Sequence, residues 1–223
     1  MKMKKLFFIV LFIGLSLLSY HLRLFHIKGS KYTFSLFSFL GPLPTAFIGP
    51  ISGLIAIFLT EFIHKTTILT HISLFTFLRF FILPISSIYF TYFHKNKIII
   101  LIPLICMLLF LINPTGRASY VYTLYWLIPI ILPIFTKNIF MRALSTTFVS
   151  HAMGSVMFLY LFDTNPGFWI SLIPIVAIER LTFALGITIS YILLVNILNI
   201  LFKDELLIEN EYVLKMPNIN IQL

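Results

Sequence analysis

The stretch that decides the fold is Phe168–Phe202, which reads FWISLIPIVAIERLTFALGITISYILLVNILNILF and carries charge only at Glu179 and Arg180. A helix that crosses the hydrocarbon layer of a membrane needs about 20 mainly apolar residues, so this run is long enough to cross. It is too long for one perpendicular helix at about 1.5 Å per residue. It must therefore tilt, kink near Pro174 or begin as an interfacial segment. We expect the interfacial start, because aromatic residues such as Phe168 and Trp169 settle at the level of lipid headgroups.

The rest of the chain is similarly apolar. Of its 223 residues, 60% are hydrophobic and 10% are charged, and the mean hydropathy is +1.04. Soluble domains carry about 25% charged residues, and disordered chains combine low hydrophobicity with high net charge, so both classes are excluded. The single Cys106 cannot build a disulfide framework or a cysteine-based metal site within one chain. The composition therefore predicts a multi-pass protein of the cell membrane.

The net charge of +9 comes from 16 Lys and Arg residues, which stand in ones and twos at the ends of apolar runs. Such a distribution suits anionic lipid headgroups better than nucleic acid. We expect membrane lipids among the partners, and no nucleic acid.

Cutting the chain where charged or turn residues interrupt the apolar runs predicts an all-α fold, a polytopic transmembrane bundle of six or seven helices within residues 1–202. The first run has the layout of a secretory signal, but no small-residue cleavage site follows it, so we favour a first membrane helix. The short fourth and fifth runs could form a tight hairpin. The predicted runs are Lys5–Tyr20, Thr45–Ile63, His71–Phe93, Lys97–Ile112, Tyr120–Phe135, Ile139–Phe162 and Phe168–Phe202.

The orientation of the bundle depends on the number of crossings. Lys and Arg in short loops prefer the cytoplasm. With seven crossings, the N-terminal lysines share a side with Lys65 and Arg117. The opposite side holds Arg23, Lys28, Lys31, Lys95, Lys97, Lys137 and Lys203. The larger set favours an outside N-terminus, whereas the N-terminal cluster argues against it, so the rule gives a divided result. With six, both termini share a side, which we would place inside. Residues 163–167 lack positive charge and are the best candidate for an external loop, and residues 203–223 are predicted to be a short solvated tail.

The segment before the second run is rich in Gly and Pro. Residues 39–53 read FLGPLPTAFIGPISG, and a continuous helix is not expected there, because Pro removes an amide donor and Gly loosens the backbone. Irregular backbone at membrane depth is tolerated where it is buried in protein or lines a cavity. We therefore predict either a cavity wall or, with about equal weight, a tight loop with Pro50 in the first turn of a helix. The residues of the predicted wall are Gly41, Pro42, Gly49, Pro50 and Gly53.

Polar residues within the sixth run predict a surface that faces other helices. Thr146, Ser150 and Gly154 recur at a spacing of four residues, and His151 lies beside this ridge. An imidazole near mid-span is costly in lipid, so His151 should point inward, toward either a structural hydrogen bond or a ligand. Arg142 is close enough to the start of the run to act as an interfacial anchor.

Charges inside the other runs are the second group of candidate binding residues. Glu179 and Arg180 point about 100° apart on a helix, so we expect at least one of them to have a distant partner. Arg79 is the candidate partner for Glu179, and Glu61 is the candidate for Arg180. The alternative is that Glu179 and Arg180 lie at the membrane interface. The predicted substrate-binding residues are Arg79, His151, Glu179 and Arg180.

The sequence lacks the motifs of several enzyme classes. It has no H-E-x-x-H, no G-x-S-x-G, no paired intramembrane aspartates and no Walker loop. A metal site would require His71, His151 and a carboxylate to converge from distant runs, so we predict no metal and no cofactor.

The stretch Ser38–Ile63, SFLGPLPTAFIGPISGLIAIFLTEFI, resembles the membrane-embedded substrate-binding subunits (S components) of energy-coupling factor transporters, at the spacing of Gly49, Pro50 and Gly53. The resemblance implies a bundle of about six helices that binds a vitamin or similar small molecule near the outer surface. It also implies separate ATPase and scaffold subunits. The first run departs from the family, because only Gly14 and Ser16 stand where small alanine-rich motifs usually meet the scaffold.

These features favour binding and transport of a small molecule. An intramembrane enzyme is the second interpretation, and a structural subunit of a larger membrane complex is the third. Of transport and catalysis, catalysis is the less favoured function, and we assign no catalytic residue.

Overall fold

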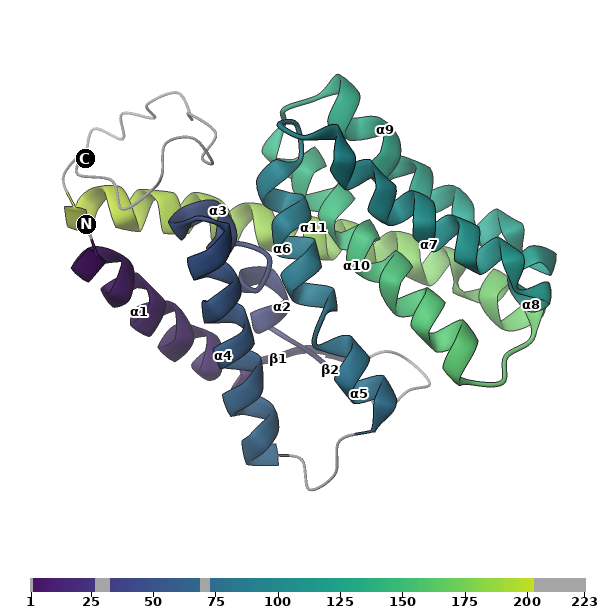
Figure 1. The fold of residues 1–223 in the computed structure, drawn as a ribbon, viewed down its shortest axis with the longest axis horizontal. Helices are drawn as coiled ribbons and strands as arrows, with labels where there is room; N and C mark the ends of the chain where they lie inside the picture. The colour runs from purple at the N-terminus through teal and green to yellow at the C-terminus, as the bar shows by residue number, and fades with distance from the viewer. Residues whose placement is uncertain (1, 27–32, 69–72, 203–223) are drawn as a thin grey trace.

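The computed structural model describes residues 2–26, 33–68 and 73–202 and is helical apart from one short hairpin (Figure 1). The helical fold predicted from the sequence is confirmed. The hairpin pairs strands β1 and β2 in antiparallel fashion. The elements are α1 (Lys2–His21), β1 (Arg23–His26), β2 (Thr33–Ser35), α2 (Phe37–Leu40), α3 (Pro44–Ile48), α4 (Pro50–Ile68), α5 (Leu74–Arg79), α6 (Ile82–Tyr92), the 3-10 helix η1 (Lys97–Ile100), α7 (Leu101–Ile112), α8 (Pro114–Ala118), the 3-10 helix η2 (Tyr120–Leu127), α9 (Ile128–Phe135), α10 (Ile139–Leu161) and α11 (Pro166–Phe202).

Three helical segments of the described residues are long and apolar enough to cross a membrane, namely Leu74–Tyr92, Ile139–Leu161 and Pro166–Leu198. The predicted fourth and fifth runs correspond to shorter apolar helices, Lys97–Ile112 and Tyr120–Phe135. They fold back on each other, because α7 contacts both η2 and α9, so the predicted hairpin is confirmed.

One local prediction about the helices is confirmed and one needs correction. Pro84 is expected to kink the third run, and the run breaks between α5 and α6 at Phe80 and Phe81, one turn before Pro84. The break has a physical cause, since the ring of Pro84 clashes with the carbonyl four residues earlier and Pro84 has no amide to donate. At the start of α11, Trp169 is only 2% exposed and packs in the protein interior, so it is not an interfacial anchor.

Helices α1 and α4 run parallel to each other, which the sequence did not indicate. Near the start of α1, Phe8 stacks on Phe47, whose ring centroid is 6.0 Å away, just before α4 begins. At the end of α1, Tyr20 stacks on His64 near the end of α4, with ring centroids 3.5 Å apart, and on Phe37, at 4.3 Å. The chain therefore returns between Phe37 and Phe47 along the length of α1 before α4 starts. We call residues 36–49 the return segment.

Close backbone packing stabilises the return segment. The break between α3 and α4 is at Gly49, whose φ of 85° is a conformation that favours glycine. A Cβ on Gly53 would lie 2.4 Å from the backbone of Thr45, so α4 approaches α3 more closely than any side chain would allow. On its other side, the hydroxyl of Thr45 lies 2.6 Å from that of Thr91 in α6. The predicted broken segment is confirmed, in the form of a tight, packed loop.

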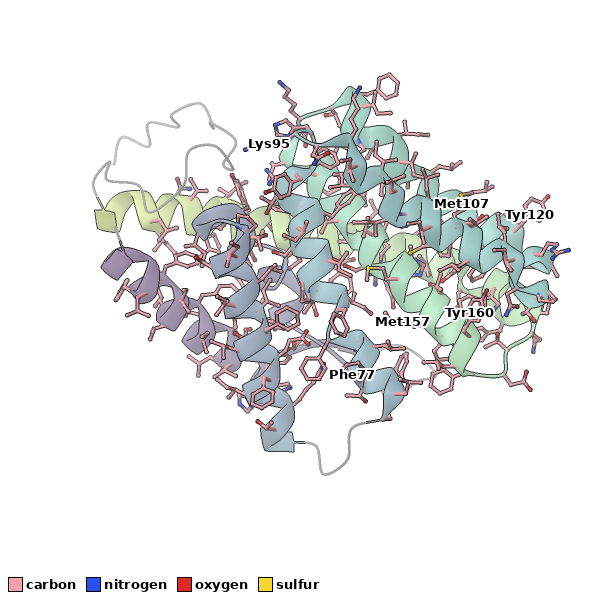
Figure 2. The ribbon with its side chains drawn as sticks, viewed as in Figure 1. Phe77, Lys95, Met107, Tyr120, Met157 and Tyr160 are labelled. Carbon is pink, nitrogen blue, oxygen red and sulfur yellow. The ribbon has the colours of Figure 1, made fainter. Side chains whose placement is uncertain are left out.

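Because of the return segment, the start of α1 lies at the same end of the bundle as the connections at Lys95 and Lys137. We call this end the Lys95 end. It holds the starts of α1, α4, η1 and α10 and the ends of α6, α9 and α11. The opposite end, which we call the Tyr160 end, holds the ends of α1, α4, α7 and α10 and the start of α11. Figure 2 shows Lys95 near one end and Tyr120 and Tyr160 near the other. Two hydrogen bonds tie the Tyr160 end together: the Tyr160 hydroxyl donates to the Leu109 carbonyl at 2.8 Å, and the Thr115 hydroxyl donates to the Thr164 carbonyl at 3.5 Å.

Candidate functional site: the polar core around helix α10

Helix α10 lies at the centre of the bundle, where it contacts α5, α6, α7, α9, α11 and η2 (Figure 1). Its polar side chains follow the predicted ridge. Ser150 bonds to Ser86 of α6 at 2.6 Å, and Gly154 lies against Ile82. The prediction that this ridge faces other helices is confirmed. We use the name polar core for the polar residues that α10 gathers, namely Arg142, Thr147, His151 and Ser155 of α10, Tyr122 and Trp126 of η2, and Glu179 and Arg180 of α11.

His151 is at the centre of a chain of hydrogen bonds. The indole N–H of Trp126 donates to His151 Nδ1 at 3.4 Å, and His151 Nε2 lies 2.7 Å from the hydroxyl of Tyr122. A neutral imidazole that accepts at Nδ1 carries its proton on Nε2, so it donates to Tyr122. The Tyr122 hydroxyl is then free to donate to Ser155 Oγ at 3.2 Å. His151 points inward, as predicted, and each ring nitrogen has a protein partner.

Aromatic rings enclose this chain of hydrogen bonds. Phe110 packs with its ring centroid 5.1 Å from that of Trp126 and 5.0 Å from that of Trp169. Tyr122 lies 5.1 Å from Trp169 by the same measure. Such T-shaped contacts are favourable beyond the area they bury. The rings enclose the hydroxyl of Tyr122 and the imidazole of His151 inside the bundle, in an apolar region where hydrogen bonds are strong.

Glu179 and Arg180 pair with each other, and the expected distant partners are not used. Their closest atoms, Oε2 and Nη2, are 3.4 Å apart, so the flexible side chains bridge the angle between neighbouring positions. Arg180 is 7% exposed, donates from Nη1 to the carbonyl of Thr147 at 3.4 Å and lies over the ring of Phe183. The proposed pairing of Glu61 with Arg180 is wrong, because Glu61 bonds to Lys65 at 3.0 Å instead.

Arg79 lies apart from the other predicted binding residues. It is exposed at the end of α5, where its guanidinium lies 5.6 Å from the ring centroid of Phe75, so its expected pairing with Glu179 is wrong. The structure therefore gathers His151, Glu179 and Arg180 around α10 and α11 and leaves Arg79 near Glu61 and Lys65.

Arg142 is the residue of this site that the sequence did not identify. It is 0% exposed, so it is not the interfacial anchor that we predicted. Its Nε donates to the carbonyl of Phe90, and its guanidinium lies 4.0 Å from the ring centroid of Phe90. Both terminal nitrogens are buried without a hydrogen-bond partner among the described residues. One sequence signal points to it, because Arg142 extends the ridge of Thr146 and Ser150 by one further step of four residues.

Arg79, His151, Glu179 and Arg180 line neither of two hollows in the described part of the chain. The first, of about 390 Å³, lies at the Lys95 end. The second, of about 350 Å³, is an apolar groove between α2 and α11. The predicted cavity wall of Gly41, Pro42, Gly49, Pro50 and Gly53 lines neither of them.

A metal site is not found in the described residues, where no group of three or more His, Cys, Asp or Glu side chains is close enough to hold an ion. His71, one of the histidines considered from the sequence, lies outside the described residues, as does the predicted tail at 203–223.

Comparisons with family models, curated proteins and solved structures give no match to this chain.

Proposed function

We propose that this chain is a multi-pass membrane protein that binds a small molecule with an anionic group in the polar core and takes part in its transport. The observation that carries the proposal is Arg142, a fully buried guanidinium whose two terminal nitrogens have no partner in the part of the chain that the structure describes. An unpaired charge inside a bundle surrounded by lipid is costly, whereas a carboxylate or phosphate would bond to both nitrogens at once.

The charge balance of the polar core also supports an anionic ligand. Glu179 is its only carboxylate, and it is already paired with Arg180 at 3.4 Å. Arg142 therefore adds a positive charge that no described acidic residue in the core balances. A bound anion would supply the missing charge, which is why we favour an acidic small molecule over a neutral one.

The polar core also extends far enough to form part of a path. Arg142 and Ser155 are thirteen positions apart on α10, which corresponds to about 20 Å along the helix axis. The hydrocarbon layer of a membrane is about 30 Å thick, so this distance is a large part of it. Polar groups at successive depths are typical of pathways through membrane proteins. This extent favours transport over binding alone.

We place the Lys95 end in the cytoplasm. In this arrangement the return segment adds a passage between α1 and α4, so Lys2, Lys4 and Lys5 share a side with Lys95 and Lys137. The N-terminal lysines, Lys95 and Lys137 then lie on the side that the rule prefers, whereas Lys65 and Arg117 lie on the outer side. Residues 163–167, which have no positive charge, lie on the outer side.

We extend the proposal to separate ATPase and scaffold subunits. The support is the resemblance of Ser38–Ile63 to transporter S components and the lack of a Walker loop in this sequence.

Native mass spectrometry of the purified protein tests the proposal. We expect an acidic compound to remain bound to the wild type through detergent washing and to be lost from Arg142→Gln. The matched control is Arg117→Gln, which removes an exposed guanidinium at the Tyr160 end and should keep the compound. A wild type that carries no compound after purification from cells, or an Arg142→Gln variant that retains it fully, would contradict the proposal.

A further inference from the structure

The Lys95 end contains a hollow that the proposed transport function does not use. It lies where the connection after α6 meets the connection between α9 and α10, and its volume is about 390 Å³. Three basic side chains line it: His94, Lys97 and Lys137. They come from two connections that are distant in the sequence, so the fold itself brings them together.

The charged side chains that the structure describes around this hollow are all basic. Among the described residues, His94 Nδ1 is buried and has no hydrogen-bond partner. Burial, followed by the charges of Arg142, Lys137 and Lys95, lowers the pKa of His94 below its usual value. The described acidic residues, Glu61, Asp163 and Glu179, all lie elsewhere, toward the Tyr160 end or in the polar core. An anion in the hollow would be attracted by the nearby charges of Lys97 and Lys137.

The rest of the lining includes Thr136 but is mainly apolar, and part of it is exposed. Phe93, Pro133, Ile134 and Phe135 line it, and Ile134 and Phe135 are 54% and 78% exposed. Pro133 has no amide hydrogen, so α9 has one backbone hydrogen-bond donor fewer close to its end at Phe135. Basic groups next to an exposed apolar wall, at the end of an apolar bundle, match the junction of a phosphate headgroup with its acyl chains.

We infer that this hollow binds a phosphate group, with Lys97 and Lys137 as the charged contacts and the wall at Pro133–Phe135 as the surface for an attached acyl chain. The chemistry that recognises the ligand is a phosphate anion, which a lipid of the inner leaflet or a free phosphate could supply. The apolar wall favours the lipid. None of the residues of the polar core lines this hollow.

The test measures the unfolding temperature of the detergent-purified protein during titration with three probes at equal ionic strength: phosphatidylglycerol, phosphatidylcholine and inorganic phosphate. We expect phosphatidylglycerol to stabilise the wild type and phosphatidylcholine not to do so. In the double variant Lys97→Gln and Lys137→Gln, the apparent affinity for phosphatidylglycerol should fall by at least about tenfold, because two charge-assisted contacts are lost.

Two further variants keep the result interpretable. Arg117→Gln removes a positive charge at the Tyr160 end and should bind phosphatidylglycerol as the wild type does. The double variant Lys97→Arg and Lys137→Arg keeps both charges and should retain binding, which separates loss of the site from loss of the fold. Stabilisation by inorganic phosphate with the same dependence on Lys97 and Lys137 would support the site and identify the free anion as its ligand. The inference is overturned if neither anionic probe exceeds phosphatidylcholine, or if Arg117→Gln weakens binding as much as the lysine variants do.

Discussion

Arg142 combines two features that rarely occur together, complete burial and two uncommitted terminal nitrogens. A buried donor without an acceptor costs about 1 to 3 kcal/mol, and more when it is charged. If a ligand normally supplies the acceptor, the empty protein bears that cost. Removal of the Arg142 charge should then raise the stability of the ligand-free protein and lower its affinity for the ligand.

We predict that Arg142→Met raises the free energy of unfolding of the ligand-free protein by about 1 to 3 kcal/mol, because a side chain of similar length replaces an unsatisfied charge. Denaturant titration in detergent micelles measures the change. A loss of stability of the same size would show that the stacking of Arg142 on Phe90 and its bond to the Phe90 carbonyl outweigh the unpaired nitrogens, and it would remove the main support for an anionic ligand.

The Tyr122 hydroxyl connects His151 to Ser155, so its removal tests the chain of hydrogen bonds. Tyr122→Phe leaves His151 Nε2 without its 2.7 Å partner and should cost about 1 to 3 kcal/mol of unfolding free energy. Tyr120→Phe is the matched control, because Tyr120 is 59% exposed, and it should change stability by less than about 0.5 kcal/mol. Equal effects of the two substitutions would contradict the proposed hydrogen bonding.

His94 gives the protein a predicted dependence on pH. Its pKa is lowered in the folded state by burial and by the charges of Arg142, Lys137 and Lys95, so the unfolded chain binds the proton more readily. The contribution of His94 to stability is therefore fully present above its unfolded pKa of about 6.5 and is lost as the pH falls toward the folded pKa. In unfolding measurements without lipid or phosphate between pH 7.5 and 5.5, His94→Gln should lose less stability than the wild type. Identical slopes would contradict this prediction.

At the scale of elements, the return segment depends on one close approach between backbones. We predict that Gly53→Ala destabilises the protein by about 1 to 3 kcal/mol, because the new methyl group would lie 2.4 Å from the Thr45 backbone, which cannot rotate away. Gly14→Ala in α1 is the control. Its new methyl group meets no atom within 4 Å, and Ala favours a helix more than Gly does, so stability should hold or rise. Thermal unfolding of the two variants separates the outcomes, and a Gly53→Ala protein as stable as wild type would argue against the packing of α3 on α4.

The elements differ in how far the sequence could predict them. Long apolar runs identify helices by composition alone, which is why α10 and α11 were expected almost at their observed bounds. The Gly and Pro residues at positions 39–53 predicted a break in the helix. The direction of the chain after such a break depends on contacts between distant residues, such as Phe8 with Phe47. The prediction that Arg142 is an interfacial anchor was wrong for the same reason. Its position near a helix end suggested an interface, whereas its burial depends on α6 and α11, whose packing against α10 no local pattern encodes.

At the scale of the whole molecule, parallel α1 and α4 change the side on which later connections lie. Without the return segment, an odd number of crossings would separate Lys4 from Lys95. With it, these two positions share a side, and the connection at Asp163 lies opposite. The placement of the polar core within the membrane, and of the phosphate site at the inner surface, both require this arrangement.

Cysteine labelling of intact cells tests the arrangement most directly. In a Cys106→Ser background, single cysteines replace Lys4, Lys95 and Asp163 in turn, and a maleimide that cannot cross membranes is added before or after permeabilisation. We predict that Asp163→Cys reacts in intact cells, whereas Lys4→Cys and Lys95→Cys react only after permeabilisation. Labelling of Lys4→Cys and Lys95→Cys from opposite sides, or of Asp163→Cys and Lys95→Cys from the same side, would contradict it.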